Sequence, residues 1–345
     1  MNIHFFVTYT KDASDSVLAQ ELKKQGVSFA IFSEYVRLRY KHRAWLYFVG
    51  WPRILLYAFR TAFKSLRATP KADWVVLGSH FEVAAFTLMT KILGGNKPKI
   101  MLMGFIYTKP LKSWKAKLKH IYFKKILGFV DRVVCHSVQE VEKNEIAFDL
   151  KNTRFVYIPY GMNVSKPPQN VNAETSVPYA LSAGRSGRDY DLLIKCFTEL
   201  GYPLHVICDS VSAISEQRQL PPNIQVFRNC YDGDYLQELA NAKLVVIPLS
   251  VGDISAGQMV LLQAMALSKP VIITKTNTIH HYVEHEKNAV LVEKDSIKEM
   301  VDAVKKIWVE PEFADKLSMN AKINFDDNYS MTAHVKNIIE VLERS

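Results

Sequence analysis

Two segments in the second half of the sequence combine glycine with residues that can bind a phosphate. In the first, Gly184 and Arg185 follow a short apolar run, and Gly187 and Arg188 precede a helical pattern that begins near Asp189. Glycine allows a ligand to approach the backbone, and two guanidinium groups beside the positive end of a helix suit a diphosphate. We therefore expect an anion site in this turn.

The second segment covers residues 255–263, where another helix is expected to begin near Gly257. Backbone N–H groups of Ala256, Gly257 and Gln258 could hold phosphate or sugar oxygens. Gln263 lies about two turns further along that helix, and its amide could hydrogen-bond a sugar diol. This segment therefore predicts a second part of the same site.

One histidine in the first half could take part in chemistry. His80 follows an apolar run that ends at Leu77, and it could act on or bind an acceptor. A single histidine is more often an ordinary core or surface residue, so both interpretations stay open. Two D-x-D strings, at 189–191 and 232–234, fall where helices are expected to begin, and carboxylates favour helix starts in any case. We expect no metal site and no cofactor.

Short apolar strands alternate with helical stretches along most of the chain, which is typical of parallel sheets covered on both faces. This predicts an α/β protein with two doubly wound, Rossmann-like domains at 1–160 and 179–325, joined by a proline-rich linker at 161–178. A helix at 326–345 is expected to pack back toward the first domain. Ligands of open α/β sheets bind at strand carboxyl ends, so we expect the site to lie in a cleft that both domains face.

The charge is divided unevenly. Residues 1–170 carry 27 Lys and Arg against 11 Asp and Glu, whereas residues 171–345 carry 17 against 23. A basic half indicates an anionic partner, either nucleic acid or anionic lipid. We find no nucleic-acid module, which leaves nucleic-acid binding the weaker interpretation.

A lysine-rich stretch in that basic half favours lipid. Residues 111–127 place apolar and aromatic side chains at helical spacing with lysines between them. Such a helix either lies in a lipid headgroup layer or packs on the core with a solvated lysine face. Residues 44–59 are very apolar, but they are too few for a membrane span and contain Pro52 and Arg53. No secretory leader is recognisable and the four cysteines form no motif, so we expect a cytoplasmic protein attached peripherally to the inner face of the membrane.

In their order and spacing, these second-half segments resemble the donor-binding domain of retaining GT-B glycosyltransferases of the family 4, or group 1, type. The string from Gly184 to Leu193 is similar to that family's G-R and K-G-x-D-L-L elements. Residues 255–270 resemble its E-G-F-P-L-V-L-L-E-A-M-A-x-G-K-P element. The resemblance covers about 155–325, and the first half shares only the strand–helix rhythm.

The resemblance implies a role for each matching residue. Arg185 and Arg188 would hold the donor diphosphate and stabilise the departing nucleotide, and Gln263 would bind the ribose. Ser255 and Gln263 replace the two glutamates of the family's element, and a neutral glutamine binds a diol more weakly than a carboxylate does. The family transfers sugars with retention of configuration and without a metal.

The sequence thus predicts transfer of a sugar from a nucleotide-sugar donor to a saccharide acceptor, lipid-linked in our interpretation, in polysaccharide or glycolipid biosynthesis. Two alternatives remain open. One is a nucleotide-sugar epimerase of the same architecture. The other is a non-catalytic subunit that binds sugar nucleotides, which the two missing glutamates suggest.

Overall fold

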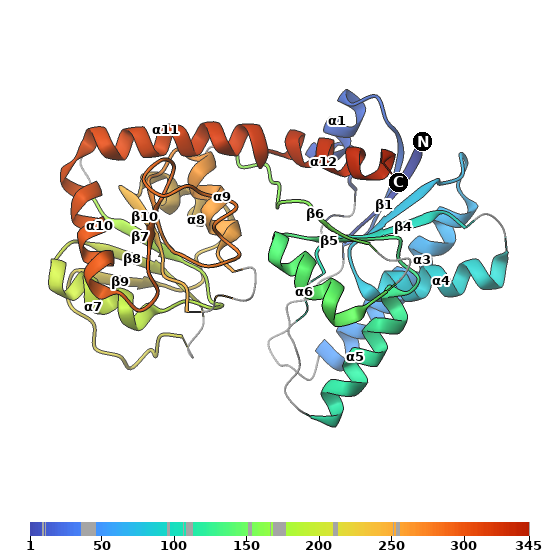
Figure 1. The fold of residues 1–345 in the computed structure, drawn as a ribbon, viewed down its shortest axis with the longest axis horizontal. Coiled ribbons are helices and arrows are strands. Elements are labelled where there is room, and N and C mark those ends of the chain that lie inside the picture. The colour runs from blue at the N-terminus through green and yellow to red at the C-terminus, as the bar shows by residue number, and fades with distance from the viewer. Residues whose placement is uncertain are drawn as a thin grey trace. The chain divides into compact units, whose positions relative to one another are not determined.

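The computed structural model describes residues 1–8, 10, 12–35, 46–94, 97–105, 107, 113–150, 154–165, 167, 177–209, 213–250, 252 and 256–344. These residues form two compact units, Met1–Pro159 with His334–Ser345 and Tyr160–Ala333. Each unit contains a six-stranded sheet with helices packed around it (Figure 1). All of the strand pairs in both sheets are parallel, so the predicted α/β class with two doubly wound sheets is confirmed.

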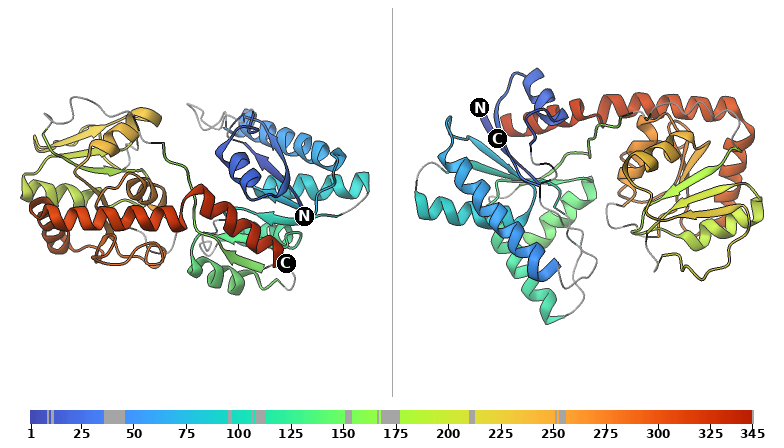
Figure 2. Two further views of the ribbon diagram at one scale, coloured as in Figure 1. Left: turned by 90° about the horizontal axis from the view of Figure 1, so that it is seen from above. Right: turned by 180° about the vertical axis from the view of Figure 1, so that it is seen from behind.

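The sheet of the first unit has the strand order β2-β1-β3-β4-β5-β6. Its strands are β1 (Asn2–Val7), β2 (Ser28–Ser33), β3 (Trp74–Leu77), β4 (Lys99–Leu102), β5 (Arg132–Cys135) and β6 (Arg154–Tyr157). Its helical elements are α1 (Val17–Lys24), the π-helical turn η1 (Leu46–Gly50), α3 (Trp51–Arg67), α4 (His80–Leu93), α5 (Trp114–Leu127) and α6 (Val138–Phe148). The last helix, α12 (Met331–Glu343), lies against this unit for most of its length (Figure 2).

The sheet of the second unit has the strand order β12-β11-β10-β7-β8-β9. Its strands are β7 (Ala180–Ala183), β8 (Leu204–Ile207), β9 (Ile224–Phe227), β10 (Leu244–Ile247), β11 (Val271–Thr274) and β12 (Val290–Val292). Its helices are α7 (Tyr190–Leu200), α8 (Asp232–Asn241), α9 (Gln258–Ala266), α10 (Ile297–Val309) and α11 (Pro311–Asn328). The central strands β7, β10 and β11 are buried along their whole length, which explains why they read as continuous apolar runs.

Both sheets contain a point at which the chain reverses the direction in which it adds strands. From β7 the chain adds β8 and β9 on one side, and it then returns to add β10, β11 and β12 on the other. Strands β7 and β10 are therefore neighbours, as β1 and β3 are in the first unit. In open α/β sheets, ligands bind outside the carboxyl ends of the strands at such a switch point. The fold thus marks the loops after β7 and β10 as the place to look for a site.

The linker expected at 161–178 falls mostly outside the described residues, and its role stays a prediction. The described Met162 forms an isolated parallel bridge with Ser330 inside the second unit. No helix in the described part of the chain combines the length and the apolar character needed to span a bilayer.

Candidate functional site

The two sequence segments with phosphate-binding character meet at the switch point of the second sheet. Arg188, in the turn after β7, forms an isolated antiparallel bridge with Leu249, which follows β10. The backbone N–H of the next residue, Asp189, donates to the Pro248 carbonyl at 2.9 Å. Asp189 also caps α7 with its side chain, so this helix begins where the sequence predicts. The backbone of the two loops is therefore fixed as one unit.

The Arg188 guanidinium is half-buried and is held against the backbone of the turn. Its Nε donates to the Ala183 carbonyl at 3.1 Å and its Nη1 to the Ser186 carbonyl at 3.0 Å. Gly184 makes room for it, because a Cβ on that residue would lie 2.7 Å from Nη2. The φ of Gly184 is also 112°, a conformation that other residues rarely adopt. Glycine at position 184 is therefore needed both for the backbone conformation and for the space that the Arg188 guanidinium occupies.

Arg188 is a cation that has no carboxylate partner in the described part of the chain. Burial lowers its pKa, and the groups that counteract this are Tyr190, Tyr235 and Cys208. The side chain still stays protonated, because an arginine pKa begins so far above neutrality. A half-buried charge without a counterion costs some free energy, which a bound anion would recover. Arg185, the other arginine of the motif, is exposed, so the two arginine side chains lie in different environments.

A tyrosine that sequence reasoning missed joins Gln263 to this turn. The Tyr235 hydroxyl, on α8, donates to Gln263 Oε1 at 2.7 Å. Burial raises the pKa of Tyr235, and the charge on Arg188 partly offsets that rise. Because the amide oxygen faces the tyrosine, the Nε2 donors of Gln263 face the other way and can bind an acceptor oxygen. Tyr235 thus holds the Gln263 amide in one orientation.

The amino terminus of α9 completes this side of the site. Its N-cap is Gly257, with φ 90°, and no side chain among the described residues caps the helix, so backbone N–H groups of its first turn have no such partner there. A Cβ on Gly257 would lie 3.2 Å from atoms of both Ile247 and Leu249, so glycine lets the helix pack closely over β10. Gln258 is buried, and its Nε2 has no hydrogen-bond partner among the described residues. Ala256 is half-buried, and Ser255 lies outside the described residues.

In the first unit, His80 is the first residue of α4, directly after the switch-point strand β3. Its Nδ1 lies 2.9 Å from the Tyr122 hydroxyl of α5, and its ring packs on Phe81 with centroids 4.1 Å apart. Burial, followed by the charge on Lys119, lowers the pKa of His80. The imidazole is therefore neutral near pH 7, as a proton acceptor must be.

The turn that carries His80 is fixed by Glu82, a residue that the sequence analysis did not single out. Its Oε2 accepts from the backbone N–H groups of Gly78 at 2.7 Å and Ser79 at 2.8 Å, and Ser79 caps α4 in return. Burial raises the pKa of Glu82 to about 7. The string S-x-x-E at 79–82 is the sequence signal of a capping box and could have revealed this residue. No such signal marks Tyr235, which reaches its place only through tertiary packing.

Other polar groups near these strand ends have structural roles. His136 is buried, and its Nδ1 donates to the Ile158 carbonyl at 2.9 Å. The Asp191 carboxylate pairs with Arg218, and 232–234 form the first turn of α8. Within the described ranges, no group of three or more His, Cys, Asp or Glu side chains is placed to hold a metal ion.

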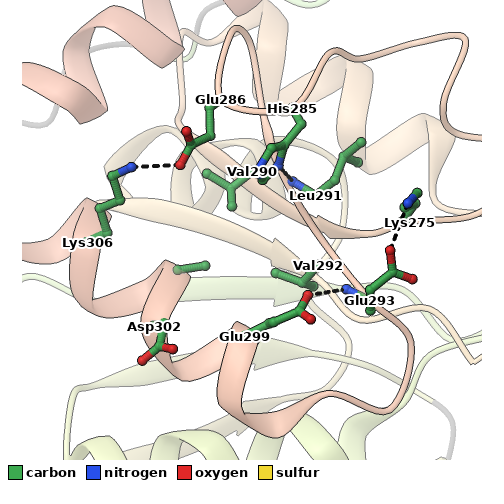
Figure 3. Close-up of a pocket in the computed structure, with 11 residues that line it drawn as sticks. Lys275, His285, Glu286, Val290, Leu291, Val292, Glu293, Glu299, Asp302 and Lys306 are labelled. Carbon is green, nitrogen blue, oxygen red and sulfur yellow. Dashed lines mark hydrogen bonds and ion pairs between the residues drawn. The ribbon is translucent and has the colours of Figure 1, made fainter.

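A cavity of about 510 Å³ lies along the edge strand β12, as Figure 3 shows. The N–H of Leu291 in this strand donates to His285 Nδ1 at 3.1 Å, and the N–H of Glu293, just after the strand, donates to Glu299 Oε2 at 2.7 Å. The charges around it are also partly paired, since Lys306 contacts Glu286 at 2.7 Å. Side chains that occupy an edge in this way prevent it from pairing with another strand. We assign no ligand to this cavity.

Comparison with known proteins identifies a family that resembles the second half of the chain. Residues 167–324 match the family described as Glycosyl transferases group 1, which confirms the resemblance seen in the sequence. No curated protein matches the chain.

Solved structures match over nearly the whole chain at low identity. Sucrose-phosphate synthase from Thermosynechococcus elongatus aligns with a TM-score of 0.70 and 15% identity over 100% of this chain and 98% of its own. A glycosyltransferase from Rickettsia africae aligns with a TM-score of 0.68 and 15% identity over 99% of this chain and 98% of its own. Anabaena HepE in complex with UDP aligns with a TM-score of 0.65 and 12% identity over 100% of both chains. At such identities the likeness shows the fold, which is the GT-B architecture.

Proposed function

We propose that this chain, whose residues 167–324 belong to the glycosyl transferases group 1 family, transfers a sugar from a nucleotide-sugar donor to a saccharide acceptor. The observation that carries the proposal is the Arg188 guanidinium. It lies under Gly184 at the switch point, bonded to two carbonyls and without a carboxylate among the described residues. An anionic ligand at this place would supply the missing negative charge.

A nucleoside diphosphate fits the surroundings of that guanidinium. Arg188 and the first turn of α9 offer donors to the diphosphate, and Gln263, held by Tyr235, offers donors to the ribose. Two of the similar structures are HepE with UDP and HepE with UDP-glucose, which supports a nucleotide sugar as the donor here.

In this proposal, the preorganised positive charge of Arg188, with Arg185 beside it in sequence, stabilises the negative charge that develops on the departing nucleotide. The sugar–phosphate bond breaks, the acceptor oxygen forms the new bond at the anomeric carbon, and the acceptor proton passes to the leaving phosphate. His80 binds the acceptor. Retention of configuration without a metal follows the family resemblance.

We also propose that the acceptor is a lipid-linked saccharide in polysaccharide or glycolipid biosynthesis. The protein would then work at the inner face of the membrane, attached peripherally. The net positive charge of residues 1–170 supports this, because lipid-linked saccharides lie at surfaces rich in anionic headgroups.

One observation favours a second candidate, a non-catalytic subunit that binds sugar nucleotides. Gln263 and Ser255 stand where the family's pattern has glutamates. Binding of a donor without turnover would favour this candidate, whereas turnover would exclude it.

A thermal-shift screen against UDP-, GDP-, ADP- and dTDP-sugars tests the donor assignment. A ligand at a hundred times its Kd stabilises the folded state by about 2.7 kcal/mol, so one nucleotide family should raise the melting midpoint. Arg188→Met should lose most of that rise. Arg218→Met is the matched control, because Arg218 is in the same unit but pairs with Asp191. A failure of every nucleotide, or an equal rise in Arg188→Met, would contradict the assignment.

A further inference from the structure

Helix α5 presents an apolar stripe to solvent. Trp114, Leu118 and Ile121, spaced as one helical face, are all exposed. The opposite face attaches the helix to its unit, through a hydrogen bond of 3.0 Å between His120 Nδ1 and the Tyr107 hydroxyl and through the buried residues Ile126 and Leu127. The apolar stripe therefore takes no part in packing the helix onto its unit.

A second group of exposed apolar side chains lies at the start of α3 and in the turn before it. This group consists of Phe48, Trp51, Leu55 and Leu56. The amino-terminal part of α3, drawn in blue, lies beside α5 in Figure 1 and in the right-hand view of Figure 2. Isolated exposed apolar residues are ordinary in proteins, but a contiguous group is typical of an interaction surface.

A chain of ring contacts joins the two groups. The Trp51 ring contacts Phe81 with centroids 5.4 Å apart, and Phe81 packs against His80 at 4.1 Å. His80 in turn contacts Tyr122 on α5, with ring centroids 5.6 Å apart. The surface formed by Phe48, Trp51, Leu55, Leu56, Trp114, Leu118, Ile121 and Tyr122 is called here the α3–α5 surface. It runs up to the candidate acceptor residue His80.

The charged side chains on helices α3 and α5 are all basic, and one of them, Arg60, pairs with Glu34 of the same unit at 3.7 Å. Helix α5 carries five lysines and no acidic residue, and these are Lys115, Lys117, Lys119, Lys124 and Lys125, all exposed. Helix α3 carries Arg53, Arg60, Lys64 and Arg67 and no acidic residue. Long basic side chains can extend past an apolar stripe to reach anionic groups while their stems lie along it. Apolar centre and basic border together fit an anionic lipid headgroup layer.

We infer that the α3–α5 surface docks the protein onto an anionic lipid bilayer, with Trp114, Leu118 and Ile121 inserted at the level of the headgroups. This deepens the proposed function and rests on it in one respect only, namely that the acceptor is lipid-linked. His80 then lies at the border of the docked surface, where the saccharide of such an acceptor would emerge from the membrane.

Co-sedimentation with vesicles tests the inference. Wild-type protein should bind vesicles of phosphatidylglycerol and phosphatidylcholine at low salt and should not bind phosphatidylcholine alone. Binding should weaken at 1 M salt, because the Debye length falls from about 10 Å to about 3 Å. Leu118→Glu with Ile121→Glu should lower the partition coefficient at least about 100-fold, because two apolar side chains are lost from the interface. Lys117→Ser with Lys124→Ser, a milder change, should lower it about 25-fold.

Matched controls separate docking from folding and from general charge effects. Met319 and Ile323 on α11 are 60% and 53% exposed, close to the 55% and 61% of Leu118 and Ile121. Met319→Glu with Ile323→Glu should leave vesicle binding unchanged. Quenching of tryptophan fluorescence by brominated lipid should also decrease in Trp114→Phe, which keeps an aromatic ring.

Several results would overturn the inference. One is that wild type does not bind anionic vesicles. Another is that the α5 variant (Leu118→Glu with Ile121→Glu) and the α11 variant (Met319→Glu with Ile323→Glu) lose equal amounts of vesicle binding. A third is that wild type binds no vesicles but self-associates, and the α5 variant abolishes the self-association. Nucleotide binding should be the same in the α5 variant as in wild type, since the substitutions lie in the other unit. If the α5 variant loses vesicle binding but binds nucleotide normally, the result bears on membrane docking alone. If wild type binds no nucleotide, the result bears on the proposed function alone.

Discussion

Gly184→Ala should remove most of the nucleotide affinity while the second unit remains folded. At φ 112°, an alanine is strained by about 1–2 kcal/mol. Its Cβ would lie 2.7 Å from Arg188 Nη2, so the guanidinium must move by about 0.7 Å to reach the 3.4 Å at which ordinary contact begins. That movement strains the 3.1 Å bond from Nε to the Ala183 carbonyl. The substitution thus displaces the cation without deleting it.

The expected loss follows from what Arg188 contributes when correctly placed. A hydrogen bond to a charged group contributes about 1.5–3 kcal/mol, so the Kd for the nucleoside diphosphate should rise about 10- to 150-fold. Isothermal titration calorimetry with the nucleotide identified by the thermal-shift screen measures this directly.

Gly201→Ala provides a control with similar strain and no clash. Gly201 ends α7 at φ 68°, and no atom lies within 4 Å of the Cβ that alanine would add. This variant should lose thermal stability to a similar degree and bind nucleotide with the wild-type Kd. The reasoning is refuted if folded Gly184→Ala binds as wild type does, or if Gly201→Ala loses as much affinity.

Three further changes probe other contacts. Tyr235→Phe removes the hydroxyl that orients Gln263, and it should raise the nucleotide Kd about 2- to 12-fold in calorimetry; an unchanged Kd would exclude this orienting role. Burial lowers the pKa of His136 and of His334 to about 4, so stability present above pH 6.5 is lost as the pH falls toward 4. By pH 5 the free energy of unfolding should have fallen by about 2 kcal/mol per histidine. If His136→Gln with His334→Gln melts with the same pH dependence as wild type, this prediction is contradicted. Tyr122→Phe removes the hydroxyl beside the histidine that begins α4 and should lower the transfer rate about tenfold at unchanged nucleotide Kd, whereas a purely structural hydroxyl would leave the rate unchanged.

The fold and the positions of the two glycine-containing turns were predictable because they depend on local patterns. The strand Leu244–Ile247 is entirely apolar because both faces of the sheet are covered, and this distinguishes it from an alternating strand. Gly184 and Gly257 mark the two turns because each has a positive φ that other residues avoid. Such signals need no knowledge of distant residues.

The composition of the site was less predictable because it depends on contacts between distant residues. Spacing alone could not distinguish the exposed Arg185 from Arg188, whose direction is set by carbonyls at 183 and 186. Tyr235 meets Gln263 only because α8 and α9 pack into the same hydrophobic cluster against the sheet. For residues 111–127, of which 111 and 112 lie outside the described residues, periodicity allowed either a core helix or a surface helix, and the structure shows the stripe with Trp114 exposed.

The most direct test of glycosyl transfer is the release of nucleoside diphosphate from the stabilising nucleotide sugar, measured with purified wild type and with Arg188→Met. Glycosyltransferase activity predicts steady release by wild type, faster with a membrane extract as the acceptor source, and a fall of at least about 100-fold in the variant. Release that is absent from wild type with every donor, or equal in the two proteins, would contradict the account.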